Sequence, residues 1–191
     1  MLPSRPNYTP TEVNAALDRL EQQRVWFIPV RASQWDREGY VESRLNETAL
    51  LLDDQSFNQA RLMLFAPPDQ ATPLDMKFGD GIKLIGYALA PNRLTLVWRA
   101  TGTPSRDYTV FTHVLATDGT LLTQHDAPPK VPTSAWKLGE IILDVHELAI
   151  PTDRPLMLTA GLYRPDTGDR LPVDATAPEP NAVFITALAP R

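Results

Sequence analysis

The feature that most constrains the fold of this chain is a two-residue alternation of side chains that recurs along its C-terminal part. In one such run Leu94, Leu96 and Trp98 share one face of an extended strand, and the residues between them share the other. The other runs are IKLIGYAL, YTVFTHVL, LLTQHD, EIILDVHEL, LMLTAGLY and AVFITAL, with turn signals between them. This pattern predicts a mostly β fold, with an antiparallel β-sandwich of immunoglobulin or jelly-roll type and roughly seven to nine strands at residues 74–191.

The Asp118-Gly119 pair gives the most specific local prediction in this region. Both residue types tolerate the positive φ angles that a two-residue hairpin loop requires. We therefore expect the segment Tyr108–Asp126 to form a β-hairpin.

The first 66 residues follow a different pattern, in which helical and extended segments alternate. Thr9, Pro10 and Glu12 supply an N-cap hydroxyl, a proline for the first turn and a capping-box glutamate, so we expect a helix to begin at Pro10. The apolar run Val25–Ile28 predicts a short strand. A second capped segment with apolar residues at helical spacing, Val41, Leu45 and Ala49, begins near Asp36.

A second predicted strand, Arg61–Phe65, ends before Pro67-Pro68, which cannot continue a hydrogen-bonded ladder. The order helix, strand, helix, strand predicts a partial α/β segment at residues 1–66, with a domain boundary at about residues 67–73. Its short strands are expected to be parallel and to lack neighbours, so the segment should lean on the sandwich or on another copy. A homodimer follows as an expectation.

Charge and composition exclude several classes of function. A formal net charge of −5 and a pI near 5.2 give no electrostatic basis for binding nucleic acid, which requires clustered Lys and Arg. Cysteine is absent, which excludes disulfides, a thiolate nucleophile and cysteine-ligated metals. Because no apolar run approaches the roughly 20 residues that span a bilayer, we expect the chain to be soluble, as a piece cut from a membrane protein would also be.

Six blocks in the predicted sandwich carry a resemblance to a known family. They are FGDGIKLIGY, LTLVWRA, YTVFTHVL, DGTLLTQHDAPP, PTSAWKLGE and GLYRPDTGDRLPV, in this order. The succession resembles the C-terminal soluble domain of large bacterial membrane proteins related to the dolichyl-phosphate-mannose-type mannosyltransferases. RVWFIPV, WDREGYVESRL and ARLMLFAPP are similar to the periplasmic α/β segment that precedes the sandwich in those proteins.

The resemblance implies a non-catalytic accessory module. Transferase chemistry would lie in a many-helix membrane portion in cis, and the present chain would be extracytoplasmic, periplasmic or at the cell surface, and tethered to the membrane in the parent protein. It would bind glycan, lipid-linked sugar or a protein partner, with no cofactor and no catalytic residues carried over. A structural spacer and a stand-alone hydrolase or metalloenzyme remain as alternatives.

The hydrolase or metalloenzyme alternative depends on His113, His125 and His146, which have Asp126 and Asp144 nearby in the sequence. A sandwich that brings these side chains together would form a metal site or a general-base pair. The chain has no short pair of the form His-x-His or His-x3-His, and partly buried histidines that hydrogen-bond across a sheet explain the pattern as well. We therefore assign no metal-ligating residue.

Carbohydrate binding gives the sharpest candidate site. An aromatic platform made by Trp136 and Tyr163 would pack on a sugar ring, and polar side chains, with Asp126 and His125 as candidates, would bind its hydroxyls. Trp98 is a more distant candidate for the platform, but it alternates in phase with core residues and is expected to be buried.

Three other segments have a plainer interpretation than a functional one. Ser134 lacks the G-x-S-x-G context of a nucleophile and is expected in a turn formed by Pro132-Thr133-Ser134, with Trp136 covering one end of the sandwich. The acidic segment Asp166–Arg170 supplies too few ligands for calcium and predicts a hairpin turn. Asp36 is expected to cap a helix, because no glycine-rich loop accompanies it.

Overall fold

A computed structural model describes residues 9–20, 22–29, 39–58 and 60–190. The chain divides into two compact units, Met1–Ala71 with Ala88–Pro91, and Thr72–Tyr87 with Asn92–Arg191. The prediction of a mostly β protein with antiparallel sheets is confirmed. None of the helices in the described ranges is long and apolar enough to cross a membrane.

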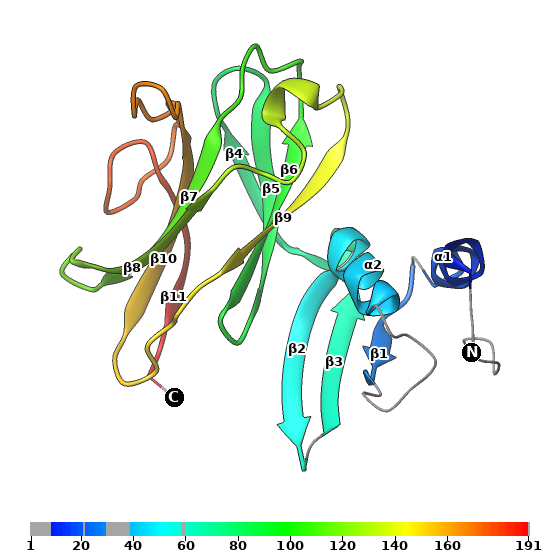
Figure 1. The fold of residues 1–191 in the computed structure, drawn as a ribbon. Helices are drawn as coiled ribbons and strands as arrows, with labels where there is room; N and C mark the ends of the chain where they lie inside the picture. Colours follow the sequence, from blue (N-terminus) through cyan, green and yellow to red (C-terminus); the bar gives the residue numbers. More distant parts are fainter. Residues whose placement is uncertain (1–8, 21, 30–38, 59, 191) are drawn as a thin grey trace. The chain divides into compact units, whose positions relative to one another are not determined.

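The first unit is a small α/β unit with two helices and a three-stranded sheet (Figure 1). The helices are α1 (Pro10–Asp18) and α2 (Tyr40–Thr48), and the strands are β1 (Val25–Phe27), β2 (Leu50–Phe57) and β3 (Ala60–Ala66). The strand order is β1-β3-β2. Both pairings are antiparallel, so the expectation of parallel strands is wrong. The reason is a tight β2–β3 connection at Asn58 (φ 41°), which reverses the chain before a parallel crossover can form.

Local hydrogen bonds explain where the first helix begins. The Thr9 side chain accepts a hydrogen bond from the Glu12 backbone N–H, and the Glu12 carboxylate accepts one from the Thr9 backbone N–H, as the capping box predicts. Helix α2 begins after Gly39, which is left-handed at φ 66° and makes no side-chain cap. The predicted cap at Asp36 lies outside the described residues.

The core of the α/β unit is formed by apolar residues that both helices and the sheet contribute. Val13 and Leu17 of α1 and Val41 and Leu45 of α2 are buried, at the helical spacing that the sequence shows. They pack with residues of the sheet and of the Ala88–Pro91 segment: Leu51, Met63, Phe65 and Ala90. Ala49, expected in register with α2, is instead extended and ends the helix.

An ion-pair network on the same unit joins helix α2 to both long strands. The Arg61 guanidinium donates to Asp54 at 2.6 and 2.8 Å and to Glu42 at 2.8 Å. These two carboxylates raise the pKa of Arg61, the hydrogen bond to Asp54 being the largest cause. The network connects the first turn of α2 to strands β2 and β3.

The second unit is a β-sandwich of two four-stranded antiparallel sheets. One sheet has the order β11-β10-β7-β8 and the other β4-β5-β6-β9 (Figure 1). The strands are β4 (Thr72–Lys77), β5 (Ile82–Ala90), β6 (Arg93–Ala100), β7 (Thr109–Ala116), β8 (Leu121–Ala127), β9 (Ile141–Glu147), β10 (Leu156–Tyr163) and β11 (Val183–Leu188). Every alternating run in the sequence corresponds to one of these strands, and β4 is the strand that no such run predicts.

The core of the sandwich includes the alternating apolar residues, and most of the residues between them on β6 and β7 are buried as well. Leu94, Leu96 and Trp98 of β6 are each 0% exposed, as are Val110, Val114, Leu158 and Leu162 of the facing sheet. The burial of Trp98 confirms that it belongs to the core and not to a surface platform. Burial of apolar area on this scale is the main source of stability for a sandwich.

The hairpin predicted at Asp118-Gly119 is present, but its loop has three residues and not the two that were predicted. Strands β7 and β8 pair antiparallel, and the Ala116 N–H donates to the Thr120 carbonyl at 2.8 Å, which leaves three residues in the loop. Gly119 is left-handed at φ 86°, and its N–H donates to the Ala116 carbonyl at 3.0 Å. This is the three-residue arrangement of a type I turn followed by a left-handed glycine.

Candidate functional site

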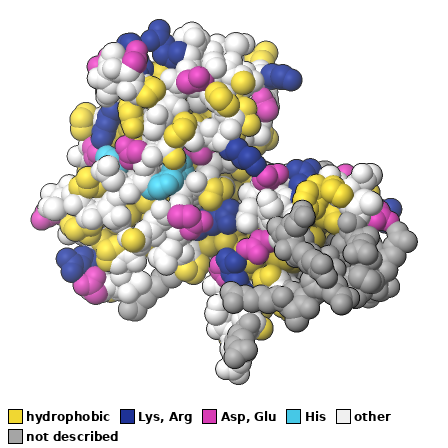
Figure 2. All heavy atoms as spheres, viewed as in Figure 1, with side chains coloured by type: hydrophobic (Ala, Val, Ile, Leu, Met, Phe, Trp, Pro, Cys, Tyr) yellow, Lys and Arg dark blue, Asp and Glu magenta, His cyan; other side chains and the backbone are white. Residues whose placement is uncertain are grey.

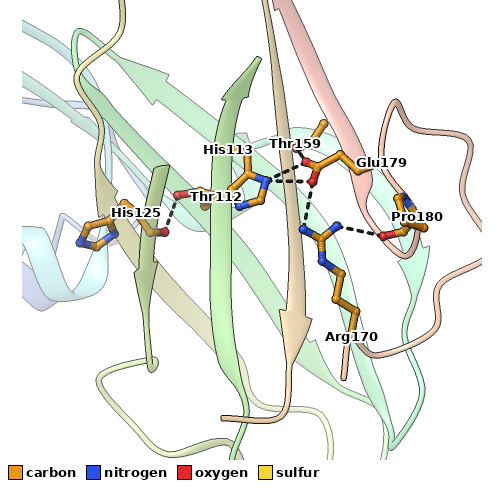
Figure 3. Close-up of polar contacts among 7 residues, drawn as sticks. All are labelled: Thr112, His113, His125, Thr159, Arg170, Glu179 and Pro180. Carbon is orange, nitrogen blue, oxygen red and sulfur yellow. Dashed lines mark hydrogen bonds and ion pairs between the residues drawn. The ribbon is translucent and has the colours of Figure 1, made fainter. Parts of the chain in front are cut away.

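Glu179 is the centre of a polar cluster on the outer face of the β7–β10 pair. Its carboxylate accepts hydrogen bonds from Thr159 Oγ1 at 2.5 Å and from Arg170 Nη2 at 3.0 Å. Both carboxylate oxygens lie 2.9 Å from His113 Nδ1. Arg170 also donates to the Pro180 carbonyl at 3.0 Å (Figure 3). These contacts fasten the segment before β11 onto the sheet.

The electrostatics of Glu179 follow from these partners. Burial alone raises the pKa of Glu179, but the hydrogen bonds from Thr159, Arg170 and His113 outweigh burial and hold the pKa below its ordinary value. Glu179 is therefore ionised at neutral pH, and its charge is balanced within the cluster. The arrangement leaves the carboxylate fully occupied, so its role is to hold the loop.

The Phe111 ring contacts two members of this cluster, Arg170 and His113. The Arg170 guanidinium lies 4.1 Å from the centroid of the Phe111 ring, and the His113 ring lies 4.8 Å from it. Gly161 sits opposite Phe111 on β10, and a Cβ atom built on it would lie 2.4 Å from Phe111 Cζ. The absence of a side chain at position 161 is what lets the Phe111 ring lie flat on the sheet.

A second polar cluster, a series of hydrogen-bonded side chains, lies between the two sheets at the edge formed by β8 and β9. The Asp144 carboxylate accepts from Trp98 Nε1 at 3.2 Å and lies 2.9 Å from His146 Nε2. His146 Nδ1 in turn lies 2.9 Å from His125 Nδ1. Asp144 is 5% exposed and His146 is 0% exposed, whereas His125 is half-buried. The three side chains therefore form a continuous hydrogen-bonded series from the half-buried His125 to the buried Asp144.

The structure thus divides the three predicted histidines between two places. His125 and His146 meet inside the sandwich, with the Asp144 that the sequence indicated, whereas His113 bonds Glu179 on the outer face. Alternation along β7 and β8 causes the separation, because His113 pairs with Gln124 and His125 with Thr112. In the described part of the chain no group of three or more metal-ligating residues is present.

The predicted sugar-binding residues do not form one site, and the structure corrects the aromatic platform. Trp136 is 1% exposed, and its Nε1 donates to the Val131 carbonyl at 2.9 Å, so neither face of its indole is open to a sugar. The ring is therefore part of the buried interior of its unit. Tyr163 is half-buried at the end of β10, and its ring centroid lies 6.5 Å from that of Phe111.

Asp126 and His125 are also separated, because adjacent residues of a strand point to opposite faces. Asp126 is exposed and pairs with Phe111 on the outer face of its sheet, whereas His125 faces β9. These two side chains therefore cannot bind the hydroxyls of one sugar ring together.

The segments with plainer interpretations form turns. Thr133–Ala135 is a short 3-10 helix, in which the Ser134 N–H donates to Asp107 and Thr133 Oγ1 donates to the Arg106 carbonyl. The acidic segment closes a turn in which the Arg164 N–H donates to the Asp169 carbonyl at 2.9 Å. Asp166 and Asp169 both form ion pairs with Arg164.

A cavity of about 250 Å³ lies in the α/β unit, where α1 and α2 both end. Leu17, Leu45 and Phe65 form an apolar floor, and Asp18 and Arg44 provide opposite charges at its wall. The other lining residues are Leu20, Gln22, Gln23, Val25, Thr48, Ala49, Pro67 and Pro68. Among the described residues the structure gives the Arg44 guanidinium no ion-pair partner. Arg44 was not among the site residues predicted from the sequence.

The hydrogen-bonding character of the cavity comes from two charged side chains that line it. The Asp18 carboxylate offers acceptors and the Arg44 guanidinium offers donors. The carbonyl groups of Leu17, Arg44 and Leu45 at the helix ends already accept hydrogen bonds within the chain. Such a cavity suits a small group with hydroxyls on its edge and an apolar face.

On the face that Figure 2 shows, acidic and basic side chains are interspersed and histidine side chains reach the surface. Interspersed charges of both signs do not create the continuous positive surface that binds a phosphate backbone. This view agrees with the net charge of −5.

Comparisons with known proteins show no family. No family model matches the chain, and no curated protein matches it. Among solved structures, Bacteroides uniformis beta-glucuronidase 2 with a covalently bound cyclophellitol-6-carboxylate aziridine is 10% identical, with a TM-score of 0.34, over 60% of this chain and 15% of that chain. An endonuclease/exonuclease/phosphatase from Beutenbergia cavernae is 16% identical, with a TM-score of 0.29, over 66% of this chain and 30% of that chain.

The alignments span only small parts of these larger proteins, and a likeness at this level carries no argument about function. The function has to be argued from the sites themselves.

Proposed function

We propose that this chain is a non-catalytic accessory module of a larger, extracytoplasmic, membrane-tethered glycosyltransferase-like protein, and that it binds a sugar unit of a glycan or lipid-linked sugar in the cavity of the α/β unit. The observation that carries the proposal is the cavity beside Arg44, with its apolar floor and its mixed donors and acceptors. The parent protein and its location are supported by the resemblance of the sandwich blocks.

The size of the cavity sets the size of the ligand. Sites for drug-sized molecules occupy roughly 300–1,000 Å³, and the cavity of about 250 Å³ is slightly smaller. One sugar ring is a suitable occupant, because its C–H face can pack on Leu17 and Phe65 while its hydroxyls reach Asp18 and Arg44.

The polar groups of the sandwich favour a supporting role for that unit. Glu179 accepts bonds from Thr159, Arg170 and His113, and Asp144 is bonded to Trp98 and His146. Each carboxylate thus joins parts of the sandwich that are distant in sequence. The sandwich is then a rigid scaffold for the binding unit.

The experiment is a glycan array probed with the purified chain, its Arg44→Ala variant and an Arg99→Ala control. Arg99 is exposed on β6 of the other unit and does not line the cavity, so the control removes the same kind of charge without changing the cavity. We expect saturable binding to one class of glycan, loss of that binding by at least tenfold in Arg44→Ala, and retention in Arg99→Ala.

If Arg44→Ala binds the same glycan as strongly as wild type, the cavity is not the glycan-binding site. Absence of binding to every glycan on the array would contradict the proposal and favour the structural spacer instead.

A further inference from the structure

The contact between His125 and His146 joins the two sheets of the sandwich at an open edge. Strand β8 is the last strand of one sheet and β9 the last strand of the other, and the two are not ladder partners. The 2.9 Å separation of the two Nδ1 atoms is a hydrogen bond between the sheets. We call His125 and His146 the histidine pair.

The distance between the two nitrogens limits the number of protons that the histidine pair can hold. A hydrogen bond between two Nδ1 atoms needs one N–H donor and one bare acceptor nitrogen. With both rings neutral, His125 Nδ1–H donates to His146 Nδ1, and His146 Nε2–H donates to Asp144. In this state the hydrogen bonds from His125 to His146 and from His146 to Asp144 each have one donor and one acceptor.

One added proton can be accommodated without loss of the contact. His146 takes the proton at Nδ1 and donates it to His125, whose remaining ring proton moves to Nε2, and the imidazolium is paired with Asp144 at 2.9 Å. A second proton would place two N–H donors and two positive charges face to face. The contact between β8 and β9 would then be lost.

Among the residues that the structure describes, Asp144 is the one carboxylate in bonding contact with the histidine pair. From β9, Asp144 faces the pair, while Glu147 alternates to the other face and pairs with Arg93 of β6 at 3.9 Å. From β6, Leu94 lies opposite His146, and Trp98 donates its N–H to Asp144. From β8, Asp126 points to the outer face, and from β7, Thr112 Oγ1 donates to the His125 carbonyl.

We infer that the histidine pair is a proton-sensitive contact: the folded β8–β9 edge of the sandwich keeps the pair with at most one added proton, so acidic pH lowers the stability of the folded sandwich. The folded edge accepts one proton, whereas the same two side chains in an unfolded chain accept two. The inference does not depend on the sugar-binding proposal, because it concerns the other unit.

The test is urea unfolding of the full chain and its His125→Asn variant at pH 7.5 and 5.0, with NMR of the histidine ring nitrogens at both pH values. Below the ordinary histidine pKa of about 6.5, the unfolded chain binds one proton more than the folded chain. Between that pH and pH 5.0, this difference raises the unfolding equilibrium constant by about 30-fold. On going from pH 7.5 to 5.0, we expect the unfolding equilibrium constant of wild type to rise about 30-fold more than that of His125→Asn. The reason is that asparagine keeps a hydrogen-bonding group but does not titrate.

His113→Asn serves as the matched control, since it removes a histidine but leaves the pair intact, and we expect it to keep the 30-fold contribution. In the folded wild type at pH 5.0, the ring spectra should show that one member of the pair is still neutral. The inference is overturned if both rings are charged while the sandwich stays folded and its β8 and β9 signals are unchanged, or if His125→Asn shows the wild-type pH dependence.

Discussion

Replacing Gly161 by alanine should destabilise the sandwich, because the new methyl group has no room. Its Cβ would lie 2.4 and 2.5 Å from Phe111 Cζ and Cε1 and 3.0 Å from the Asn181 carbonyl oxygen. The Phe111 ring cannot swing away easily, since it is 1% exposed and is covered by Arg170 at 4.1 Å. Overpacking of this kind costs about 1–3 kcal/mol, and we expect the upper half of that range.

The assay is urea unfolding of purified variants, with Gly79→Ala as the control. A Cβ atom at position 79 would meet only Leu171 Cγ at 3.7 Å, an ordinary contact, so this variant should unfold within about 0.5 kcal/mol of wild type. The double variant Gly161→Ala/Phe111→Leu tests the cause. If the clash is with the ring, the double variant should be more stable than the sum of the single effects by about 1 kcal/mol. Strict additivity, or a stability of Gly161→Ala equal to that of wild type, would refute the reasoning.

Two further predictions concern ionisable groups. The partners of Glu179 hold its pKa below the ordinary value, so the stability that Glu179 contributes is fully present above about pH 4.3 and is lost as the pH falls through the folded pKa. Glu179→Gln should therefore lose less stability than wild type between pH 6 and pH 3, as measured by urea unfolding. Burial, followed by the 2.9 Å hydrogen bond to Asp80, raises the pKa of Tyr108, so Asp80→Asn should lower that pKa. A spectrophotometric titration with Tyr108→Phe as the reference measures it, and an unchanged or higher value would contradict the assigned contact.

The features that could be predicted from the sequence depend on short-range chemistry. The Thr9 capping box forms between residues three apart, and the alternation of buried and half-buried residues in β5 is set by the pleat of a single strand. Strand β2 was missed because LLLDDQSF has no regular alternation and contains an irregularity in register between Leu51 and Asp53. The direction of the strands in the α/β unit depends on the turn at Asn58, which the sequence analysis did not identify.

The candidate sites depend on contacts between distant segments, so the sequence indicated their members but not their grouping. His125 and His146 meet because their strands lie at corresponding edges of two sheets, and His113 finds Glu179, which is 66 residues away. Trp136 was a candidate for an exposed platform, but in the structure the ring is buried and its Nε1 donates to the Val131 carbonyl. The cavity required both helix ends to converge, which no local pattern specifies.

The central claim is that a sugar binds in the cavity of the α/β unit, and NMR of the full chain tests it most directly. Backbone amide signals are recorded while mannose, glucose, galactose and N-acetylglucosamine are added in turn. The account predicts saturable shifts for at least one of them, concentrated on residues such as Leu17, Arg44 and Leu45, and absent in Arg44→Ala. Shifts concentrated on the sandwich, or no shift with any of the four sugars, would contradict it.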